Sequence, residues 1–188
     1  MNILNKVAKG FQILAYRLTH YSLGTTFWWA LDHGMRRITG APIRRVSQIL
    51  PQLHVGGQYK KRGWPRLARR GVTAVVNMRI EFDDRAAGIA PEKYLYLPTV
   101  DDAAPSLEQL AQGAAFIGDE IASGGGVYIH CGAGVGRAAT TAVAYLVSTG
   151  LTAEQAWAAV RRVRPFVKPT PIQLAQIEEF AEAYHAGS

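Results

Sequence analysis

The sequence predicts an α/β fold in which a central, largely parallel sheet is flanked by helices, with an N-terminal helical extension. Short apolar runs alternate with helix-like segments from residue 46 onward, which is typical of such sheets. A glycine-rich loop joins one apolar run directly to a helix-like segment, as occurs at the carboxyl edge of parallel strands. The chain has 188 residues, of which 48% are hydrophobic, enough to bury one core. We expect the extension over residues 1–45 and the folded domain over residues 46–188.

Five runs rich in β-branched, aromatic or other apolar residues predict strands, near residues 46–49, 53–55, 72–77, 94–97 and 126–129. Two segments have helical character, the basic residues 64–70 and the apolar residues 138–147. Capping boxes mark three further helix starts, namely Ser106 with Gln109, Thr152 with Gln155, and Thr170 with Gln173. Pro171 occupies the favoured first position of the last of these helices.

The run from His130 to Arg137, which reads His-Cys-Gly-Ala-Gly-Val-Gly-Arg, holds the one cysteine of the sequence. Its glycines permit positive φ angles and a close approach of the backbone to an anion. Five N–H groups between the cysteine and the arginine can therefore converge on one centre, those of Gly132, Ala133, Gly134, Val135 and Gly136. A helix N-terminus directly after such a loop also favours an anion. The sequence predicts a phosphate cradle with Cys131 at its base and Arg137 at its rim.

Each polar side chain of this loop has a candidate role. Amide dipoles and a nearby cation favour the thiolate form of a cysteine, which makes Cys131 the candidate nucleophile. Arg137 supplies a planar fork that matches two phosphoryl oxygens and can hold the extra charge of the transition state. His130 is expected to orient the loop and to help hold the thiolate, rather than to act as a base. The alternative is a buried cysteine that precedes an arginine by chance, but the strand before it and the helix after it favour the anion site.

The pattern His130-Cys131-(x)5-Arg137 resembles the signature of the cysteine-dependent protein tyrosine phosphatase superfamily. The span from Val46 to Tyr184 is similar to the dual-specificity branch, and within it to the mitochondrial phosphatidylglycerophosphate phosphatase type. The segments that carry this similarity are Thr99-Val100-Asp101, Pro105-Ser106-Leu107, Val127 to Cys131, Ala138 to Leu146, Val167-Lys168-Pro169 and Gln173-Leu174. The resemblance implies a dual-specificity phosphatase-like fold and hydrolysis of a phosphate monoester through a phosphocysteine, without a metal or a cofactor.

The resemblance also implies a general acid on a loop that follows a strand upstream of the cysteine. Asp101 is the first candidate because of the Thr-Val-Asp match, and Asp102 remains the alternative. A carboxylic acid can protonate the leaving oxygen, and the carboxylate that results can activate water for the second step. Adjacent aspartates in a turn are otherwise ordinary turn formers.

One position departs from the family pattern. The family usually carries serine or threonine directly after the arginine, whereas Ala138 follows it here. We expect slower hydrolysis of the phosphocysteine, because Thr140 and Thr141 should not reach the sulfur equally well. A catalytically weak phosphate-binding or scaffold module is therefore the alternative function.

Arsenate-reductase-like chemistry would lack partner cysteines, and a rhodanese-like use of the thiol does not fit the five-residue spacing. The loop also carries no lysine before Arg137, which argues against a polyphosphorylated inositol headgroup.

Charge is distributed unevenly along the chain, whose formal net charge is +7. Residues 1–80 hold fourteen Lys and Arg against one acid, Asp32, whereas residues 81–188 hold seven against thirteen acids. A basic half predicts an anionic partner. The sequence contains no recognised nucleic-acid-reading motif, so nucleic acid is not expected and a lipid surface is favoured.

The N-terminal segment supports a lipid partner. Its apolar residues recur every three or four positions and so share one helical face, at Leu4, Val7, Phe11, Leu14 and Leu18. Aromatic residues 27–29 follow, as is typical of helices that lie in the membrane interface. The longest uncharged stretch, residues 18–31, is shorter than the roughly 20 residues that cross a bilayer. We expect peripheral binding to an anionic membrane through residues 1–45, and packing of this segment on its own domain is the alternative.

The remaining expectations concern surroundings and surface. A single cysteine excludes an internal disulfide, and the proposed chemistry implies a reducing compartment. The histidines show no ligand spacing, so no metal site is expected. We expect a phosphorylated lipid or protein as the substrate, and a cytoplasmic protein that can lie at the inner face of a membrane. For the charged loop of Glu81, Asp83, Asp84 and Arg85, an ordinary surface position is favoured over a place at the active-site rim.

Overall fold

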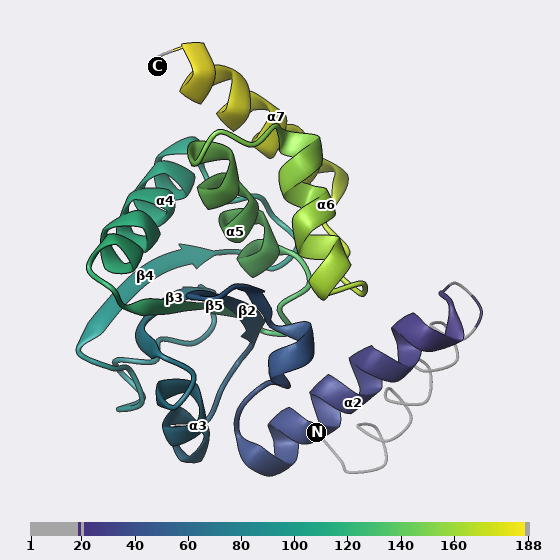
Figure 1. The fold of residues 1–188 in the computed structure, drawn as a ribbon, viewed down its shortest axis with the longest axis vertical. Helices are drawn as coiled ribbons and strands as arrows, with labels where there is room; N and C mark the ends of the chain where they lie inside the picture. Colours follow the sequence, from purple (N-terminus) through teal and green to yellow (C-terminus); the bar gives the residue numbers. More distant parts are fainter. Residues whose placement is uncertain (1–18, 20, 187–188) are drawn as a thin grey trace.

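The structure is a computed structural model that describes residue 19 and residues 21–186. These residues form a five-stranded sheet in the order β1-β2-β5-β3-β4, with helices on both sides (Figure 1). The strands are β1 (Gln48–Leu50), β2 (Leu53–Gly57), β3 (Val72–Arg79), β4 (Lys93–Thr99) and β5 (Gly126–Cys131). β1 pairs antiparallel with β2, whereas β2, β5, β3 and β4 run parallel to one another. The predicted α/β fold with a largely parallel sheet is confirmed.

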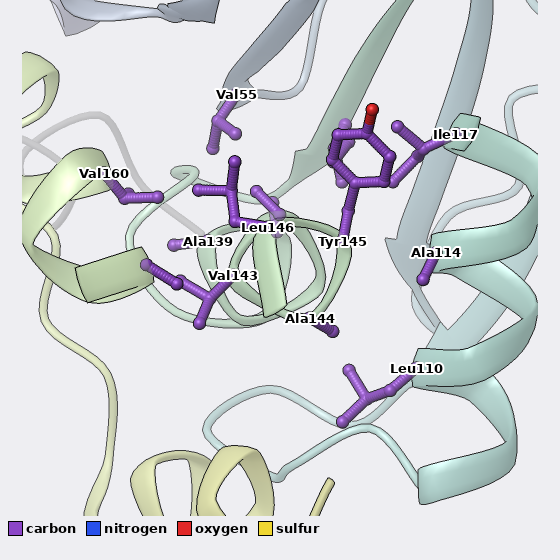
Figure 2. Packing of buried hydrophobic residues seen from close by; sticks show 14 of the residues in the cluster. Val55, Leu110, Ala114, Ile117, Ala139, Val143, Ala144, Tyr145, Leu146 and Val160 are labelled. Carbon is purple, nitrogen blue, oxygen red and sulfur yellow. The ribbon is translucent and has the colours of Figure 1, made fainter. Parts of the chain in front are cut away.

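One face of the sheet is covered by α4 (Leu107–Ala122), α5 (Arg137–Ser148), α6 (Ala153–Val163) and α7 (Pro171–Ala186) (Figure 1). α5 lies in the middle of this layer and contacts each of the other three helices. Figure 2 shows Leu146 of α5 near Val55 of β2 and Val160 of α6. Each of these buried aliphatic side chains contributes about 1.5–3 kcal/mol of hydrophobic free energy. This packing fixes α5, and with it the loop that enters the helix.

Three of these helices begin where their capping boxes predict. The Ser106 and Thr152 boxes are complete, with side-chain and backbone hydrogen bonds in both directions. At the start of α7, the Gln173 Oε1 atom accepts from the Thr170 N–H over 3.1 Å, and Thr170 Oγ1 accepts from the Gln173 N–H over 3.4 Å. The sequence therefore predicted these helix starts to the residue.

Two predicted elements extend beyond the observed ones, whereas β2 to β5 and α5 are each longer than predicted. The residues before β1 form a short 3-10 helix (Arg44–Val46), so the first strand begins two residues later than expected. The basic helix α3 (Trp64–Ala68) on the opposite face ends two residues early. Gly71 adopts a φ of 84° there, a conformation that turns the chain back into β3.

The described part of the N-terminal extension is dominated by α2 (Leu23–Thr39), which runs from an N-cap at Ser22 to Gly40 with a φ of 81°. The side chains that α2 buries are polar: Thr26, Asp32 and Arg36. Amphipathic helices usually bury their apolar face, so the polarity of α2 is reversed. The apolar helical face predicted over residues 4–18 lies outside the described residues. No helix in the described part of the chain is long and apolar enough to span a bilayer.

Candidate active site

The glycine-rich loop lies at the carboxyl edge of the sheet, between the end of β5 and the start of α5. β5 is flanked by β2 and β3, and Cys131 is paired with Gly57 of β2. Cys131 is 3% exposed, and the Gly134 N–H donates to its sulfur over 3.2 Å. Gly134 has a φ of 71°, and a Cβ atom there would collide with the backbone of Gly56. Glycine is therefore required at position 134 for the amide to reach the sulfur.

Two buried arginines hold the carbonyl groups of the same loop. Arg164, which follows α6, donates from Nε to Gly134 O over 2.6 Å and from Nη2 to Ala133 O over 2.9 Å. Arg36 of α2 donates from Nη1 to Gly132 O over 3.3 Å. The C=O and N–H of a peptide chain turned this way face opposite sides, so carbonyls bound by arginine leave the amides directed toward an anion. Sequence reasoning did not identify either arginine.

Asp32 of α2 supplies the counter-charge for both arginines. Its carboxylate lies 3.4 Å from Arg164 Nη2 and 3.7 Å from Arg36 Nε, and it accepts a hydrogen bond from the Ile43 N–H over 3.0 Å. Burial lowers the pKa of the Arg164 guanidinium, and the charge of Asp32 is the first to oppose this shift. Asp32 is 1% exposed. It is also the single acid of the first eighty residues, and this isolation is the signal by which the sequence could have revealed its role.

Arg137 is 1% exposed and engages two carboxylates and two backbone carbonyls. Its Nη1 and Nη2 donate to the two oxygens of Glu81 over 2.9 and 3.1 Å, and Nη1 also donates to Thr99 O over 2.7 Å. Burial lowers the pKa of Arg137, but the hydrogen bonds to Glu81 and the charge of Cys131 outweigh burial and raise it. The Nε atom is buried without a partner among the described residues. Such a donor is costly to leave unpaired, and a phosphoryl oxygen would satisfy it.

The two candidate acids differ in their contacts. Asp101 Oδ1 lies 2.7 Å from Arg137 Nη2, although the Asp101 side chain is 78% exposed. Asp102 has a φ of 63°, and its backbone carbonyl accepts from Thr170 Oγ1 over 3.0 Å. The structure therefore brings Asp101 to Arg137. Asp102 helps attach the segment between β4 and α4 (residues 100–106, called the acid loop below) to the start of α7.

The charged loop after β3 is part of the site, so its interpretation as an ordinary surface loop was wrong for two of its residues. Glu81 binds Arg137, and this hydrogen bond is the main cause that lowers the pKa of Glu81 to about 2. Asp84 is fully buried, and its Oδ2 lies 2.6 Å from His130 Nε2. The Asn77 side chain holds the loop in this position by donating to Phe82 O over 2.7 Å. These contacts join residues that come together only in the folded chain, so no spacing in the sequence predicts them.

His130 lies beneath the loop in an aromatic cluster. Its ring packs edge-on against Tyr59 and stacks on Tyr128, with centroids 5.4 and 5.9 Å apart. Asp84 binds its Nε2 atom and also accepts from the Gln58 amide over 2.8 Å. The carboxylate thus fixes the orientation of the His130 ring. Nδ1 has no partner among the described residues.

The position after Arg137 offers no hydroxyl group. Ala138 is fully buried at the second residue of α5. Thr140 Oγ1 donates to Gly136 O over 3.2 Å, and Thr141 Oγ1 donates to Arg137 O over 3.1 Å. Both threonine hydroxyls are occupied by backbone carbonyls, as expected for groups that do not serve the sulfur.

Gln173 of α7 connects the acid loop to the glycine loop. It is 1% exposed, and its Nε2 donates to Ala103 O over 2.8 Å. A Cβ atom at Gly136 would meet its Oε1 at 2.9 Å. The sequence marked Gln173 as a capping residue and did not show that the same side chain touches both loops.

Comparison with known proteins identifies the family. Residues 53–183 match the model of the dual specificity phosphatase catalytic domain. The chain is 32% identical over 157 residues to human dual specificity phosphatase 28, covering 81% of this chain and 88% of that protein. It is 29% identical over 175 residues to phosphatidylglycerophosphate phosphatase PTPMT2 of Arabidopsis thaliana, covering 89% and 69%. The crystal structure of PTPMT1 in complex with PI(5)P has a TM-score of 0.69 and 29% identity, covering 74% of this chain and 96% of that one.

Some relatives are much longer than this chain, and the residues that match the family model do not include every residue of the site. The chain spans 21% of the length of Slingshot homolog 3 of Rattus norvegicus, to which it is 32% identical over 140 residues. Residues 53–183 include Cys131, Arg137 and Asp101, but they exclude Asp32 and Arg36 of α2. A match to 131 consecutive residues that contain the whole glycine loop is decisive. The chain belongs to the dual-specificity phosphatase family, whose catalytic domain residues 53–183 match.

Proposed function

We propose that this protein hydrolyses phosphate monoesters through a phosphocysteine intermediate, and that its substrate is an anionic phospholipid of the phosphatidylglycerophosphate kind. The observation that carries the proposal is the Arg137 Nε donor, buried and unpaired among the described residues, at the end of a loop whose amide already donates to the Cys131 sulfur. A phosphoryl group would bind to both. Electrostatic stabilisation of this kind commonly contributes more to catalysis than any other single effect.

The reaction proceeds in two steps. The Cys131 thiolate attacks phosphorus, the S–P bond forms as the P–O bond breaks, and Asp101 gives its proton to the departing oxygen. Before this step, phosphoryl oxygens take the place of Asp101 on Arg137 Nη2, and the carboxylate freed in this way takes a proton from solvent and so becomes the acid. Asp101, now ionised, takes a proton from water as the water attacks phosphorus and the S–P bond breaks. Inorganic phosphate leaves, and the thiolate and the acid are restored.

A lipid substrate is supported by the relatives and by the loop. PTPMT2 of Arabidopsis thaliana is named a phosphatidylglycerophosphate phosphatase. The residues between Cys131 and Arg137 carry no charge, which suits a single terminal phosphate better than a polyphosphorylated ring. We therefore favour a phospholipid monoester over a phosphoprotein for this chain.

Membrane binding is supported by the reversed polarity of α2. Its exposed apolar side chains recur every three or four residues and so form one stripe, made of Leu23, Phe27, Leu31, Met35 and Ile38. Leu23 and Ile38 are 75% and 72% exposed. A helix with an apolar outer face and neighbouring cations is typical of proteins that lie on anionic bilayers. We infer that this stripe, rather than residues 4–18 alone, contacts the lipid and keeps the protein peripheral at the cytoplasmic face of its membrane.

The catalytic proposal is tested by turnover of a generic aryl phosphate and of phosphatidylglycerophosphate in vesicles, with a tyrosine phosphopeptide for comparison. We expect turnover of the aryl phosphate that is abolished by Cys131→Ser, and a higher kcat/KM for the lipid than for the peptide. If the wild-type protein and Cys131→Ser both fail to turn over the aryl phosphate but still bind phosphate, the result would instead support the scaffold alternative that Ala138 favours. A higher kcat/KM for the peptide would reject the lipid assignment.

The membrane proposal is tested by sedimentation with vesicles of phosphatidylcholine and phosphatidylglycerol. Deleting residues 1–40 would also remove Asp32 and Arg36, so substitutions in the full chain are preferable. We expect Ile38→Gln, and more strongly Phe27→Gln with Ile38→Gln, to weaken binding. Ile172→Gln on α7 is the matched control because Ile172 is also exposed, at 56%. If Ile38→Gln and Ile172→Gln weaken vesicle binding equally, the apolar stripe of α2 is not the membrane contact.

A further inference from the structure

A basic pocket lies beside the glycine loop, between the end of α2 and the segment that follows β2. Its volume is about 280 Å³, and it is lined by His33, Arg36, Arg37, Gln58 and Lys60. Three of the five residues carry a permanent positive charge, and none is acidic. We call it the α2 pocket.

The α2 pocket shares a wall with the phosphate cradle. The Gln58 N–H and Arg36 Nη1 both donate to Gly132 O, over 3.1 and 3.3 Å. Gly132 directly follows Cys131, and Gly57, next to Gln58, is the sheet partner of Cys131. One loop residue thus separates the lining of this pocket from the reacting sulfur.

The positive charge of the pocket exceeds what the fold neutralises. Arg36 is balanced by Asp32, 3.7 Å away. Arg37 and Lys60 are exposed, and neither has a carboxylate within ion-pair distance among the described residues. Lys60 Nζ instead donates to Arg37 O over 3.4 Å, which keeps the ammonium at the end of α2. Two cations without a counter-charge therefore border a pocket that adjoins an anion site.

We propose that the α2 pocket binds a second phosphate of the substrate, the phosphodiester that a phosphatidylglycerophosphate-type lipid carries three carbons from its terminal phosphate. This inference rests on the proposed function, because the terminal phosphate must occupy the cradle at Cys131. Arginine and lysine are the residues that bind phosphate oxygens most strongly. A substrate with both phosphates gains contacts that a simple monoester lacks, so the pocket sets substrate selectivity.

The experiment compares three water-soluble phosphate monoesters, so that no membrane contributes. These are the deacylated headgroup with both phosphates (glycerophosphoglycerol phosphate), glycerol 3-phosphate and an aryl phosphate. The readout is the ratio of kcat/KM for the two-phosphate headgroup to that for glycerol 3-phosphate. We expect the full-length Arg37→Gln, Lys60→Gln double variant to lower this ratio at least tenfold, because two charge-assisted contacts reach only the second phosphate.

A matched control carries the same loss of charge elsewhere. Arg69→Gln with Arg162→Gln removes two exposed cations that do not line the α2 pocket, and we expect it to keep the ratio within twofold of the wild-type value. If both double variants change the ratio equally, long-range attraction explains the selectivity and the α2 pocket is not a subsite. A parallel assay uses phosphatidylglycerophosphate in vesicles. If the Arg37, Lys60 variant loses activity only in that assay and keeps the wild-type ratio for the soluble esters, the pocket meets neighbouring lipids and the proposal is also rejected.

Failure of the proposed function would give a different result. If the wild-type protein turns over none of the three esters, hydrolysis is not its activity. Binding to Cys131→Ser, measured by calorimetry, then still tests the pocket, with tighter binding of the two-phosphate headgroup than of glycerol 3-phosphate expected, and this preference lost in the Arg37, Lys60 variant. Equal affinities of Cys131→Ser for both ligands would refute the subsite without reference to catalysis.

Discussion

Arg137 is held by groups of the protein itself, namely Glu81, Asp101 and two backbone carbonyls. These contacts hold the guanidinium in one orientation, so little conformational entropy is lost when a phosphoryl group binds. The loop from Cys131 to Arg137 could be predicted because its chemistry is contained in consecutive residues. The roles of Glu81 and Asp84 could not be predicted from the sequence. The loop that carries them is held against the site by Asn77 and Tyr94, which lie on different strands.

The first residue-scale prediction separates the two candidate acids. We expect Asp101→Asn to lower kcat on an alkyl phosphate by about 100-fold or more, the range for loss of a general acid. The loss should be smaller on an aryl phosphate with an acidic leaving group, which needs less protonation. Asp102→Asn is the matched control and should have little effect, since among the described residues the hydrogen bond of Asp102 is made by its backbone carbonyl. Steady-state kinetics with both substrates decide, and a larger loss for Asp102→Asn would reverse the assignment.

The second residue-scale prediction concerns Glu81 and pH. Hydrogen bonds from Arg137 lower the pKa of Glu81 to about 2, so its carboxylate stays charged throughout the acid limb of an ordinary pH profile. Glu81→Gln should lower kcat/KM about tenfold, or 1.4 kcal/mol of transition-state stabilisation, because Arg137 is held less firmly. The midpoint of the acid limb should not move. A shifted midpoint would show that Glu81 titrates in catalysis. Glu92→Gln, which replaces another exposed glutamate, controls for the change of charge.

At the scale of elements, α2 is the part of the N-terminal extension that contacts the glycine-rich loop. Its outer face is apolar and its inner face carries Asp32 and Arg36, which reach the loop and Arg164. Helices such as α4 and α6 could be predicted because their caps are local and their apolar faces point inward. The inward face of α2 could not, because hydrophobic periodicity places the apolar side of a helix in the core and here it lies outside.

The prediction at this scale is that Asp32→Asn destabilises the fold and loosens the loop. Removing one partner of a buried charge cluster costs about 3–5 kcal/mol, because Arg36 and Arg164 remain buried without a counter-charge. Urea unfolding measures the loss, and inhibition by vanadate or inorganic phosphate measures the loop, with weaker binding expected in the folded variant. Asp119→Asn on α4 is the control, since Asp119 is exposed. A variant with unchanged stability and unchanged anion affinity would contradict this account of the cluster.

At the scale of the whole molecule, the basic part of the chain and the family domain cover different residues. The first eighty residues are strongly basic, and they supply α2, the strands β1, β2 and β3, and the lining of the α2 pocket. The family match begins at residue 53, within this basic half. The charge imbalance could be predicted from composition alone, whereas its division between buried loop supports and exposed cations required the fold.

The prediction for the whole fold concerns His54, which lies fully buried in β2. Burial, and then Arg70 and Arg44, lower its pKa from 6.5 to about 4. The unfolded chain binds a proton below pH 6.5 and the folded chain does not until about pH 4. The contribution of neutral His54 is therefore complete above pH 6.5 and is lost as the pH falls, at about 1.4 kcal/mol per pH unit.

Urea unfolding between pH 7.5 and 4.5 measures this loss. His54→Gln should flatten the pH dependence of the unfolding free energy, even if the variant is less stable at neutral pH. His185→Gln on α7 is the control, because His185 is exposed. An unchanged slope in His54→Gln would mean that other groups govern the acid sensitivity of the fold.

The position of Asp32 has a consequence for how this catalytic unit can be cut or transplanted. A fragment trimmed to residues 53–183 would keep the nucleophile, the arginine and the acid, yet its Arg164 would lose the carboxylate that balances it. Chimeras that exchange the domain between relatives would face the same mismatch unless α2 moved with it. For this chain, the smallest transferable unit therefore begins at Ser22, where the helix that carries Asp32 is capped.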